Sequence, residues 1–463
     1  MLTRDNLFKF QQEDVDKLLP QRSALIANEM GTGKTWEAIA LDAFKRNGDT
    51  SQRTLVVCNK SQIENTWGKL YGELTSLPVV TYSNKDRADF IKRLYAPGGG
   101  VFIINWEALR LLPELRDVHW FCIIADECQK MKNRKAQQSI ALRRIKGYHK
   151  MALSGTPITN KPHDYWPVLN WLFPSSFGSY WSFYKKHIEY EIIYPQGYHK
   201  IKGPKNVDVL LNSLRPYYVR HLKKAQCCSH HPNGVMQYLP DKLYTEIWVD
   251  LTPEQRIAYN QMNKELIAWV GEHKDKPLVA PVVIAKLVRL QQFAIAFCDV
   301  EFDQSDAHVT MSLPSSKIDA VLEILEDNDE QVVIFSQFSK AINLLCSELA
   351  RKGISHASFT GDTSDNERVR IVQEFLSGKI RVFAGTIKAG GVGLDLYSAS
   401  TVIFLDRSWS PAENFQAEDR LHRHGQKNAV QVIDIMARRT IDLGRKQQVQ
   451  QKWEWIKELL GDK

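Results

Sequence analysis

The chain has 463 residues, a length typical of about three domains. It is 43% hydrophobic and 25% charged, an ordinary globular composition, and its formal net charge of +8 permits a polyanionic partner without requiring one. No run reaches the ~18 apolar residues of a membrane span, and the amino terminus lacks the apolar core of a signal peptide, so we expect no membrane partner. Seven cysteines, an odd number, favour reduced thiols in a cytosolic compartment.

The first third of the chain alternates short apolar runs with helical stretches. Because the runs are continuously apolar, they predict strands of a parallel sheet that is covered on both faces. Ligands bind such sheets at the carboxyl ends of the strands, and the chemically informative residues follow these runs. The predicted strands are residues 24–27, 55–58, 101–105, 121–125 and 151–153.

The last third has the same plan. Ser364 and Glu367 form a capping box at the start of a helical stretch, and Gly378 closes that helix. We therefore predict a second α/β lobe. Its predicted strands are residues 332–335, 382–384, 402–405 and 430–435.

The middle of the chain is aromatic, basic and mainly helical in period. Thr252 as N-cap, Pro253 at the first position and Gln255 predict a helix start. Polar breaks predict loops or linkers at residues 195–205, 271–281 and 299–316. The expected divisions are lobe 1 (1–160), a helical insertion and linker (161–310), lobe 2 (311–445) and a C-terminal helix (446–463).

Residues 28–35, Asn-Glu-Met-Gly-Thr-Gly-Lys-Thr, carry the strongest motif. Gly31 and Gly33 let backbone N–H groups approach a phosphate, Lys34 would reach the β and γ phosphates, and Thr35 would bind magnesium. The strict P-loop pattern has glycine where this chain has Asn28. The alternative is a glycine-containing turn that opens a helix.

Two further motifs carry charged groups suited to phosphoryl transfer. Asp126 and Glu127 follow an apolar run, so Asp126 is suited to hold magnesium and Glu127 to orient and deprotonate the attacking water. Arg420 and Arg423 lie three residues apart on one helix face and could act as arginine fingers. The plainer alternatives are a solvated strand end and a basic solvated helix face.

In this order, the motifs resemble those of the Swi/Snf-like DNA-translocating ATPases of helicase superfamily two. The resemblance covers nearly the whole chain. Residues 409–426 match the W-x-P-x-x-x-x-QAxDRxHRxGQ block almost letter for letter, and residues 153–160 match LSGTPxxN. Residues 215–223, 239–242 and 251–259 resemble helical elements found in this family.

The resemblance implies a fold of two RecA-like P-loop lobes with parallel sheets and a mainly helical insertion between them, with ATP and Mg²⁺ as cofactors. It implies catalytic roles for the following residues: Lys34, Thr35, Asp126, Glu127, Arg420 and Arg423. Residues expected to contact ATP are Phe8, Gln11, Met30, Gly31, Thr32, Gly33, Lys34, Thr35 and Gly393. Residues expected to couple hydrolysis to movement are Gln129, Ser154, Thr156 and Gln426. Residues expected to contact nucleic acid are Lys132, Asn133, Arg134, Lys135, Thr386, Lys388 and Trp409.

The chain departs from the family pattern in several places. Asn28 stands where the family has Asp, and Asp395 stands where the family has Asn. Cys128 and Gln129 replace the last two residues of DEAH. Cys128 could be a redox switch, although a small residue tolerated in a turn is the simpler interpretation. A group of His and Cys residues suggests zinc, but its spacing fits no standard structural site. That group is His221, Cys227, Cys228, His230 and His231.

Basic residues concentrate next to Asp126 and Glu127 and around residues 153–160, the LSGTPxxN match, which we call the third motif. Residues 128–163 contain no acid, and residues 200–224 contain only Asp208. Such a run is often only a solvated face, but its position suggests a surface that binds nucleic-acid phosphates without sequence preference.

The resulting hypothesis is an ATP-driven translocase on double-stranded DNA, in the compact form typical of bacteria or phages, and therefore cytoplasmic. A targeting protein partner would direct it. The alternatives are a strand-separating or annealing helicase on forked DNA or RNA, and a non-catalytic nucleic-acid-binding scaffold.

Overall fold

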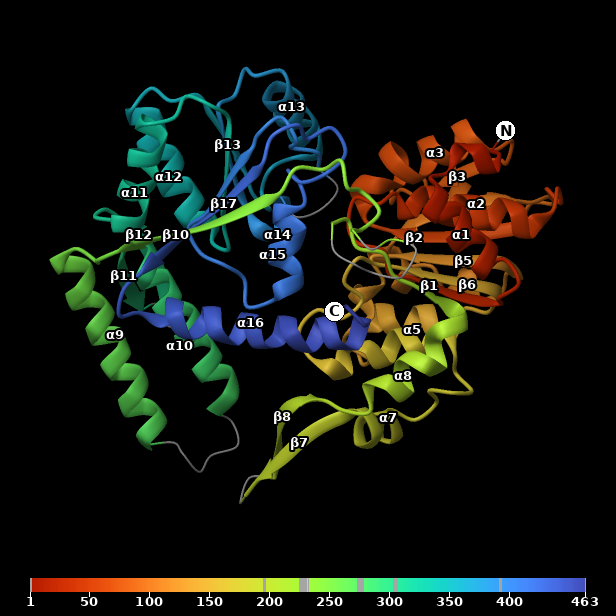
Figure 1. The fold of residues 1–463 in the computed structure, drawn as a ribbon, viewed down its shortest axis with the longest axis horizontal. Coiled ribbons are helices and arrows are strands. Elements are labelled where there is room, and N and C mark those ends of the chain that lie inside the picture. The colour runs from red at the N-terminus through yellow and green to blue at the C-terminus, as the bar shows by residue number, and fades with distance from the viewer. Residues whose placement is uncertain are drawn as a thin grey trace. The chain divides into compact units, whose positions relative to one another are not determined.

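The computed structural model describes residues 2–194, 197–224, 231, 233–272, 279–302, 307–390 and 394–462. The chain divides into two compact units (Figure 1). The first unit comprises Met1–Glu191, Lys200–Gln237 and Glu454–Lys463, and the second comprises Ile192–His199 and Tyr238–Trp453. No helix in the described part of the chain is long and apolar enough to cross a membrane.

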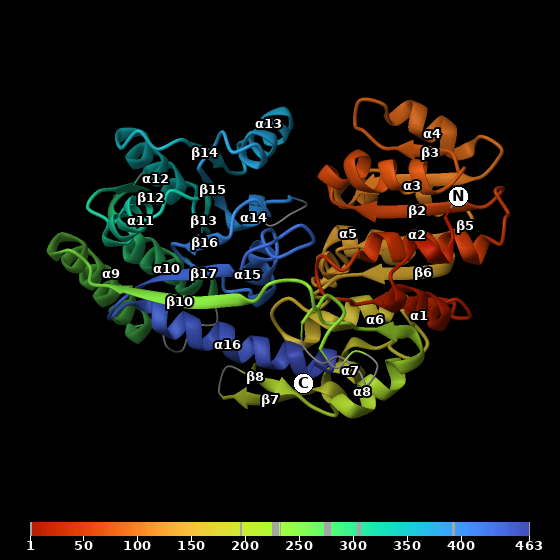
Figure 2. The ribbon, with the colours of Figure 1, turned by 45° about the horizontal axis from the view of Figure 1, so that its top comes forward.

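The first unit is built on a sheet of seven strands in the order β3-β4-β2-β5-β6-β1-β9, and every pair is parallel. Figure 2 shows strands of this sheet side by side, with α2 running along it. All five strands predicted in this region are confirmed. The strands are β1 (Ser23–Ile26), β2 (Arg53–Cys58), β3 (Val79–Thr81), β4 (Gly100–Asn105), β5 (Trp120–Asp126), β6 (Gly147–Leu153) and β9 (Tyr218–Val219).

Helices cover both faces of this sheet because alternate residues of its strands point to opposite sides. On β4, Val101 and Ile103 join a core with helices α1 and α2, whereas Phe102 packs against Phe90 of α4 on the other face. The helices of this unit are α1 (Lys9–Leu18), α2 (Lys34–Arg46), α3 (Lys69–Leu74), α4 (Arg87–Tyr95), α5 (Gln137–Arg144), α6 (Trp166–Leu172), α7 (Tyr180–His187) and α8 (Val207–Leu214).

The second unit has its own parallel sheet of six strands, in the order β10-β17-β16-β13-β15-β14. The four strands predicted here are confirmed, and the two sheets confirm the predicted pair of RecA-like lobes. The strands are β10 (Lys242–Val249), β13 (Val332–Ser336), β14 (His356–Phe359), β15 (Val382–Thr386), β16 (Thr401–Phe404) and β17 (Val430–Ala437).

Two buried clusters hold helices against the faces of this second sheet. One joins α11 and α12 to the sheet, and the other joins α13, α14 and α15. Of the capping box predicted for α13, the structure has the hydrogen bond from the Glu367 N–H to the Ser364 side chain, and Gly378 adopts a positive φ after the helix as predicted. The helices are α9 (Pro253–Glu272), α10 (Val279–Ile295), α11 (Ser316–Glu326), α12 (Ser339–Arg351), α13 (Asp365–Leu376), α14 (Ile387–Gly390), α15 (Pro411–Glu418) and α16 (Ile441–Leu460).

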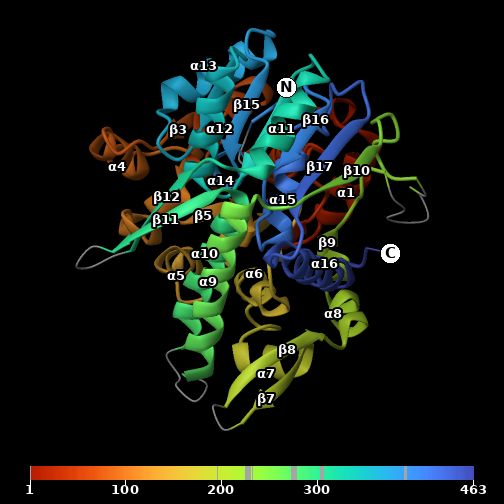
Figure 3. The same cartoon turned by 90° about the vertical axis from the view of Figure 1, so that its left-hand side faces the viewer.

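The middle of the chain is less purely helical than its periodicity predicts. It supplies β9 to the first sheet and β10 to the second, in addition to two separate two-stranded sheets. Figure 3 shows both of these sheets and the long helices α9 and α10. The pairs are β7 (Ile188–Ile193) with β8 (Tyr198–Pro204), and β11 (Phe297–Phe302) with β12 (Ala307–Ser312).

All three predicted loops were therefore wrong in part. Residues 198–204 and 307–312 form strands β8 and β12. In β12, apolar residues alternate with polar ones, and the apolar Val309 and Met311 are buried in a hydrophobic cluster, which is the pattern of a half-buried strand. The loop predicted at residues 271–281 includes the end of α9 and the start of α10.

Candidate functional site

The carboxyl edge of the first sheet brings together residues 28–35, the pair Asp126 and Glu127, and the third motif, residues 153–160. Strands β5, β6 and β1 are neighbours, and both Ile26 and Asp126 are register partners of Leu153. The residues that follow these three strand ends are thereby brought together, as the strand order of an open parallel sheet requires.

The glycine-rich loop after β1 has the backbone geometry of a phosphate cradle. Gly31 and Gly33 adopt φ values of 78° and 84°, which other residues rarely tolerate. Lys34 begins α2, and its ammonium donates hydrogen bonds to the carbonyls of Asn28 and Glu29, at 2.9 and 3.0 Å. Burial lowers the Lys34 pKa, against the opposing effects of Glu127 and Asp126. Asn28 therefore does not prevent a P-loop conformation.

Gln11 braces this loop from α1. Its side-chain amide donates to the carbonyls of Thr32 and Gly33, at 3.0 and 3.3 Å, while its oxygen accepts from the Phe8 N–H at 2.9 Å. A Cβ on Gly33 would lie only 2.7 Å from the Gln11 Nε2 atom. Phe8 is 55% exposed and stacks with Phe10. Gln11 thus fixes the loop, and the exposed Phe8 ring lies three residues away from it in the chain.

Asn28 is the hub of a buried polar network. Its side-chain amide donates to Asp14 at 2.8 Å and to Glu37 at 3.0 Å, and its oxygen accepts from the His221 N–H at 2.8 Å. The His221 ring contacts Asp14 at 2.9 Å. Burial, and then the charge of Asp14, raise the Glu37 pKa well above its ordinary value. An amide at position 28 suits two carboxylates better than a third carboxylate would.

Asp126 and Glu127 occupy the end of β5. The Asp126 carboxylate accepts from the Trp67 indole at 3.0 Å, and the Trp106 indole donates to the Asp126 carbonyl at 3.0 Å. Burial, and then Glu127, raise the Asp126 pKa to about 7. Glu127 has a φ of 51°, which turns the chain sharply after the strand and places its side chain beside the glycine-rich loop's lysine, whose pKa it affects.

The two departures from the family's DEAH pattern have different structural consequences. The Gln129 amide donates to the Glu127 carboxylate at 2.5 Å, so this residue orients the expected catalytic base. Cys128 is fully buried, and its burial raises the pKa of the thiol well above the ordinary value. A buried neutral thiol is unreactive, which favours the structural interpretation over the redox switch.

The expected coupling residues of the third motif lie against the same edge. Ser154 and Thr156 are buried, and the Ser154 hydroxyl accepts from the Thr156 N–H at 3.0 Å. A Cβ on Gly155 would lie 2.6 Å from the Met30 side chain. The third motif therefore packs directly on the glycine-rich loop.

The oxygen atoms at this edge fit a magnesium ion. Mg²⁺ prefers hard oxygen ligands and one or two carboxylates alongside substrate phosphates. Asp126 and the hydroxyl of Thr35 would supply such ligands. Burial and the neighbouring half-buried Glu127 raise the Asp126 pKa, and a divalent cation would compensate the charge of these two carboxylates.

Arg220 is a residue at this edge that the sequence did not single out. It follows β9, and its guanidinium donates to the carbonyls of Ala27 and Gly155 at 2.6 and 2.8 Å. It also forms a bidentate pair with Asp462, at 2.9 and 2.7 Å. The only sequence signal was its place in a basic segment that resembles a family element. Arg220 ties the end of β1 to the third motif.

In the second unit, Arg420 and Arg423 are brought together by a carbonyl that both contact. Each donates to the Leu394 carbonyl, at 3.4 and 3.2 Å. Arg423 also pairs with the Asp395 carboxylate, and burial lowers the Arg423 pKa to about 10. Asp395 therefore neutralises one of the two expected arginine fingers.

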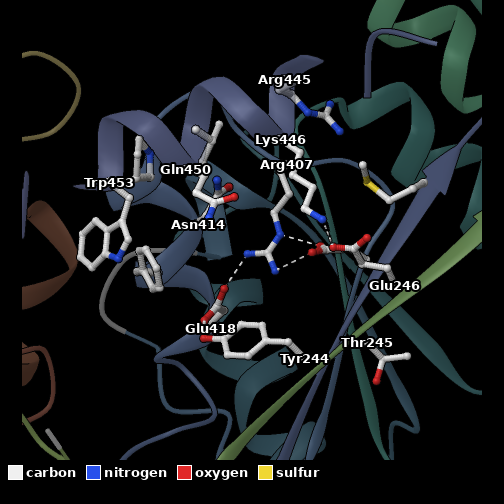
Figure 4. A pocket seen from close by; sticks show the side chains of 15 residues that line it. Tyr244, Thr245, Glu246, Arg407, Asn414, Glu418, Arg445, Lys446, Gln450 and Trp453 are labelled. Atoms are coloured by element: carbon white, nitrogen blue, oxygen red, sulfur yellow. Dashed lines mark hydrogen bonds and ion pairs between the residues drawn. The ribbon is translucent and has the colours of Figure 1, made fainter. Parts of the chain in front are cut away.

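An ion network positions the helix that precedes these arginines. The Arg407 guanidinium pairs with Asp434 at 2.6 Å and with Glu418 at 2.5 Å, and Figure 4 shows the contact with Glu418. Glu418, the last residue of α15, also accepts from Lys242 and Tyr244 of β10. A cavity of about 620 Å³ beneath α16 is lined in part by Arg407, Asp434, Glu418 and Tyr244. The network fixes the end of α15, two residues before Arg420.

Expected nucleic-acid contacts in the first unit lie on a turn and a short loop after β5. Lys132, Asn133 and Lys135 are exposed, whereas the Arg134 guanidinium lies 4.1 Å from the centre of the Tyr180 ring. The rest of the basic run does not continue this surface. Lys150 lies midway along β6 and donates to the Trp171 carbonyl at 2.9 Å, and Lys146 directly precedes the amino end of that strand. The acid-free run is therefore divided between opposite edges of the sheet.

The expected nucleic-acid contacts of the second unit differ in exposure. Lys388 is exposed, Thr386 is buried, and the half-buried Trp409 indole donates to Gln291 at 3.1 Å. The Gln426 amide is occupied by the carbonyls of Tyr397 and Ala399, so here it fixes a turn. The expected ATP contact Gly393 lies outside the described residues.

The zinc alternative gains no support from the described part of the chain, where no group of three or more His, Cys, Asp or Glu could hold a metal ion. Asp14 contacts His221, and Glu13 contacts His231 at 3.3 Å. Residues 227, 228 and 230 lie outside the described residues.

The fold and the site define a class, the helicase-type proteins with two P-loop-like lobes. Residues 7–294 match the family model described as the SNF2-related domain, and residues 316–425 match the helicase conserved C-terminal domain. The chain belongs to the SNF2-related family.

Similar proteins come from bacteria and eukaryotes. A Mycoplasma genitalium protein named "Uncharacterized ATP-dependent helicase" is 27% identical over 98% of this chain and 42% of its own length. The human SWI/SNF-related matrix-associated actin-dependent regulator of chromatin subfamily A member 1 is 27% identical over 91% of this chain and 40% of its own length. The chain spans less than half the length of these relatives.

Among solved structures, one described as the Sulfolobus solfataricus SWI2/SNF2 ATPase core in complex with dsDNA is 23% identical. It covers 98% of this chain and 97% of its own, with a TM-score of 0.44.

Proposed function

We propose that this protein hydrolyses ATP to move along double-stranded DNA. The observation that carries the proposal is the convergence of Lys34, Asp126 and a Gln129-oriented Glu127 at the carboxyl edge of the first sheet. Membership of the SNF2-related family supports the same activity.

Different residues at this edge would have different roles in phosphoryl transfer. Lys34 would exchange its loop carbonyls for the β and γ phosphates, and the positive end of α2 would stabilise them further. Glu127, held by Gln129, would orient the attacking water and take its proton. Phe8 would contact the adenine ring, and Gln11 would hold the loop below it.

Bound Mg²⁺ would supply positive charge that stabilises the transferring phosphoryl group, with Asp126 and Thr35 holding it. Arg420 and Arg423 of the second lobe would stabilise the same developing charge. The packing of Gly155 on Met30 gives a direct route by which a change at the phosphate loop reaches the third motif.

DNA would be bound through its phosphates, without sequence preference, by the exposed Lys132, Asn133 and Lys135 and by Lys388. Cytoplasmic location and a targeting protein partner belong to the same proposal.

The proposal is tested by ATP hydrolysis with and without blunt duplex DNA. We expect duplex DNA to raise the rate of the wild type, and Lys34→Ala and Glu127→Gln each to reduce it by about a hundredfold or more. Glu254→Gln, which changes an exposed carboxylate of α9 in the second unit, is the matched control. Equal wild-type rates with and without duplex would refute the proposal.

A further inference from the structure

An aromatic cluster lies on the surface of the first unit, next to the turn after β5. Its members are Tyr180, Trp181, Tyr184 and Tyr190, which we call the aromatic platform. Their ring centres follow one another at 5.3 to 5.7 Å and 5.1 Å. Three of the four come from α7 and the fourth from β7, and Figure 3 shows these two elements side by side.

One side of the platform packs against the protein, and the other side is exposed. Tyr184 is buried and the Tyr180 ring meets the Trp166 ring edge-on at 5.4 Å, so the cluster has a rigid base. Trp181, by contrast, is 54% exposed. A tryptophan this exposed on a rigid base is more than core packing requires and is typical of a binding surface.

Cations flank the platform on two sides. The Arg134 guanidinium lies 4.1 Å from the centre of the Tyr180 ring and belongs to the same short loop as the exposed Lys132 and Lys135. On α7, Lys185 follows Trp181 by four residues, so the two share one helix face, and both are exposed. No acidic residue occurs in α7 or between residues 128 and 163.

We propose that the aromatic platform binds unpaired bases of DNA, with the flanking cations holding the adjoining phosphates. Exposed aromatic rings beside cations are the combination that binds single strands, because every base has a π-face and every nucleotide a negative charge. Bases inside a duplex are already stacked and cannot use the platform. The protein would therefore prefer duplexes that carry a single-stranded tail, gap or fork.

This inference rests on the proposed function, since it adds a preference for unpaired regions to a motor on duplex DNA. It also gives a use to the exposed tryptophan that neither ATP hydrolysis nor phosphate contact to a duplex requires.

The test compares binding of the full chain to three labelled probes by fluorescence anisotropy: a blunt duplex, the same duplex with single-stranded tails, and oligothymidine. We expect Trp181→Ala to weaken binding of the tailed duplex and oligothymidine by about five- to a hundredfold, with blunt-duplex binding changed less than about twofold. Trp181→Phe should retain most of the affinity, because phenylalanine keeps a stacking ring.

Tyr148→Ala is the matched control, because Tyr148 is an equally exposed aromatic residue near the other edge of the sheet. The inference is overturned if the wild type binds blunt and tailed duplexes equally. It is also overturned if Trp181→Ala weakens both equally, or if it changes neither, the result expected of a surface for a protein partner. Stimulation of ATP hydrolysis by the blunt duplex reports separately on the motor, so loss of the tail preference alone leaves the proposed function intact.

Discussion

At the scale of single residues, Asn28 shows how a departure from a motif can be compensated elsewhere in the fold. The amide bridges Asp14 and Glu37 in a site without solvent exposure, and the His221 backbone completes its hydrogen bonds. Two carboxylates in one buried site are tolerable because a neutral donor lies between them.

Replacing Asn28 with Asp should destabilise the first unit by about 3 kcal/mol, because it removes two donated hydrogen bonds and adds a third buried carboxylate. The pKa of Glu37 is raised in the folded state, and the added carboxyl would be buried beside it, so the folded variant binds more protons than the unfolded one. The loss should therefore be larger at pH 8 than at pH 5. Urea unfolding at both pH values measures it.

Asn28→Asp combined with Glu37→Gln is the control, since it returns the site to two carboxylates and should recover part of the loss. A single variant as stable as the wild type at pH 8 would show that Asn28 is not the hub we describe.

Asp395, the ion-pair partner of Arg423, is a second case in which a single residue departs from the family pattern. Arg423 must leave this carboxylate before it can act on a phosphate. Partly exposed pairs contribute about 1 kcal/mol or less, so Asp395→Asn should raise the steady-state ATP hydrolysis rate about two- to fivefold. Glu326→Gln, which breaks the exposed pair with Lys352, should leave the rate unchanged. A lower rate in Asp395→Asn would mean that the carboxylate supports Arg423 rather than restraining it.

At the scale of elements, the basic run after β5 shows what sequence can and cannot place. The concentration of charge was visible in the sequence, but its division depends on β6, which carries residues 147–153 back across the sheet. Lys132 and Lys135 lie on the side of the strand ends, whereas Lys146 precedes the amino end of β6.

Charge reversal separates these two groups. Lys132→Glu with Lys135→Glu should weaken stimulation of ATP hydrolysis by duplex DNA about tenfold, and should reduce the salt dependence of DNA binding, because two phosphate contacts are lost. Hydrolysis without DNA should be unchanged. Lys146→Glu is the matched control from the same run. An equal effect of both changes would support one continuous track.

The strands that the sequence predicted share one property: they are buried on both faces, so a continuous apolar run predicts them. The strands it missed lack that property. Strand β10 lies at the edge of its sheet with Leu243 and Tyr244 half-exposed or more, and β8 has only its hairpin partner. Strand β10 depends on pairing with β17, which is distant in the sequence, whereas β8 pairs with the preceding strand β7, and neither segment has the continuous apolar run that predicted the others.

The residues of the candidate site also divide into those that a local pattern predicts and those that depend on distant contacts. Lys34, Asp126 and Glu127 could be predicted because each follows a recognisable strand in the chain. Arg220 could not, because it reaches Ala27 from 193 positions away in the sequence. Trp67 and Asp14 were missed for the same reason, since their contacts with Asp126 and Asn28 form only in the folded sheet.

At the scale of the whole molecule, the chain combines two lobes of one plan with a middle segment that contributes strands to both. The first lobe holds the phosphate loop and the carboxylates, and the second holds the paired arginines. Among the described residues, the groups that we expect to act in phosphoryl transfer are divided between the two lobes, so our proposal requires both lobes for hydrolysis and attributes movement on DNA to this requirement.

Displacement of a third strand from a DNA triplex tests this central claim most directly, because a motor that moves along duplex DNA removes the third strand without separating the duplex. We predict ATP-dependent displacement by the wild type, none by Glu127→Gln, and no unwinding of a forked duplex under the same conditions. ATP hydrolysis stimulated by duplex DNA but without triplex displacement would contradict the account.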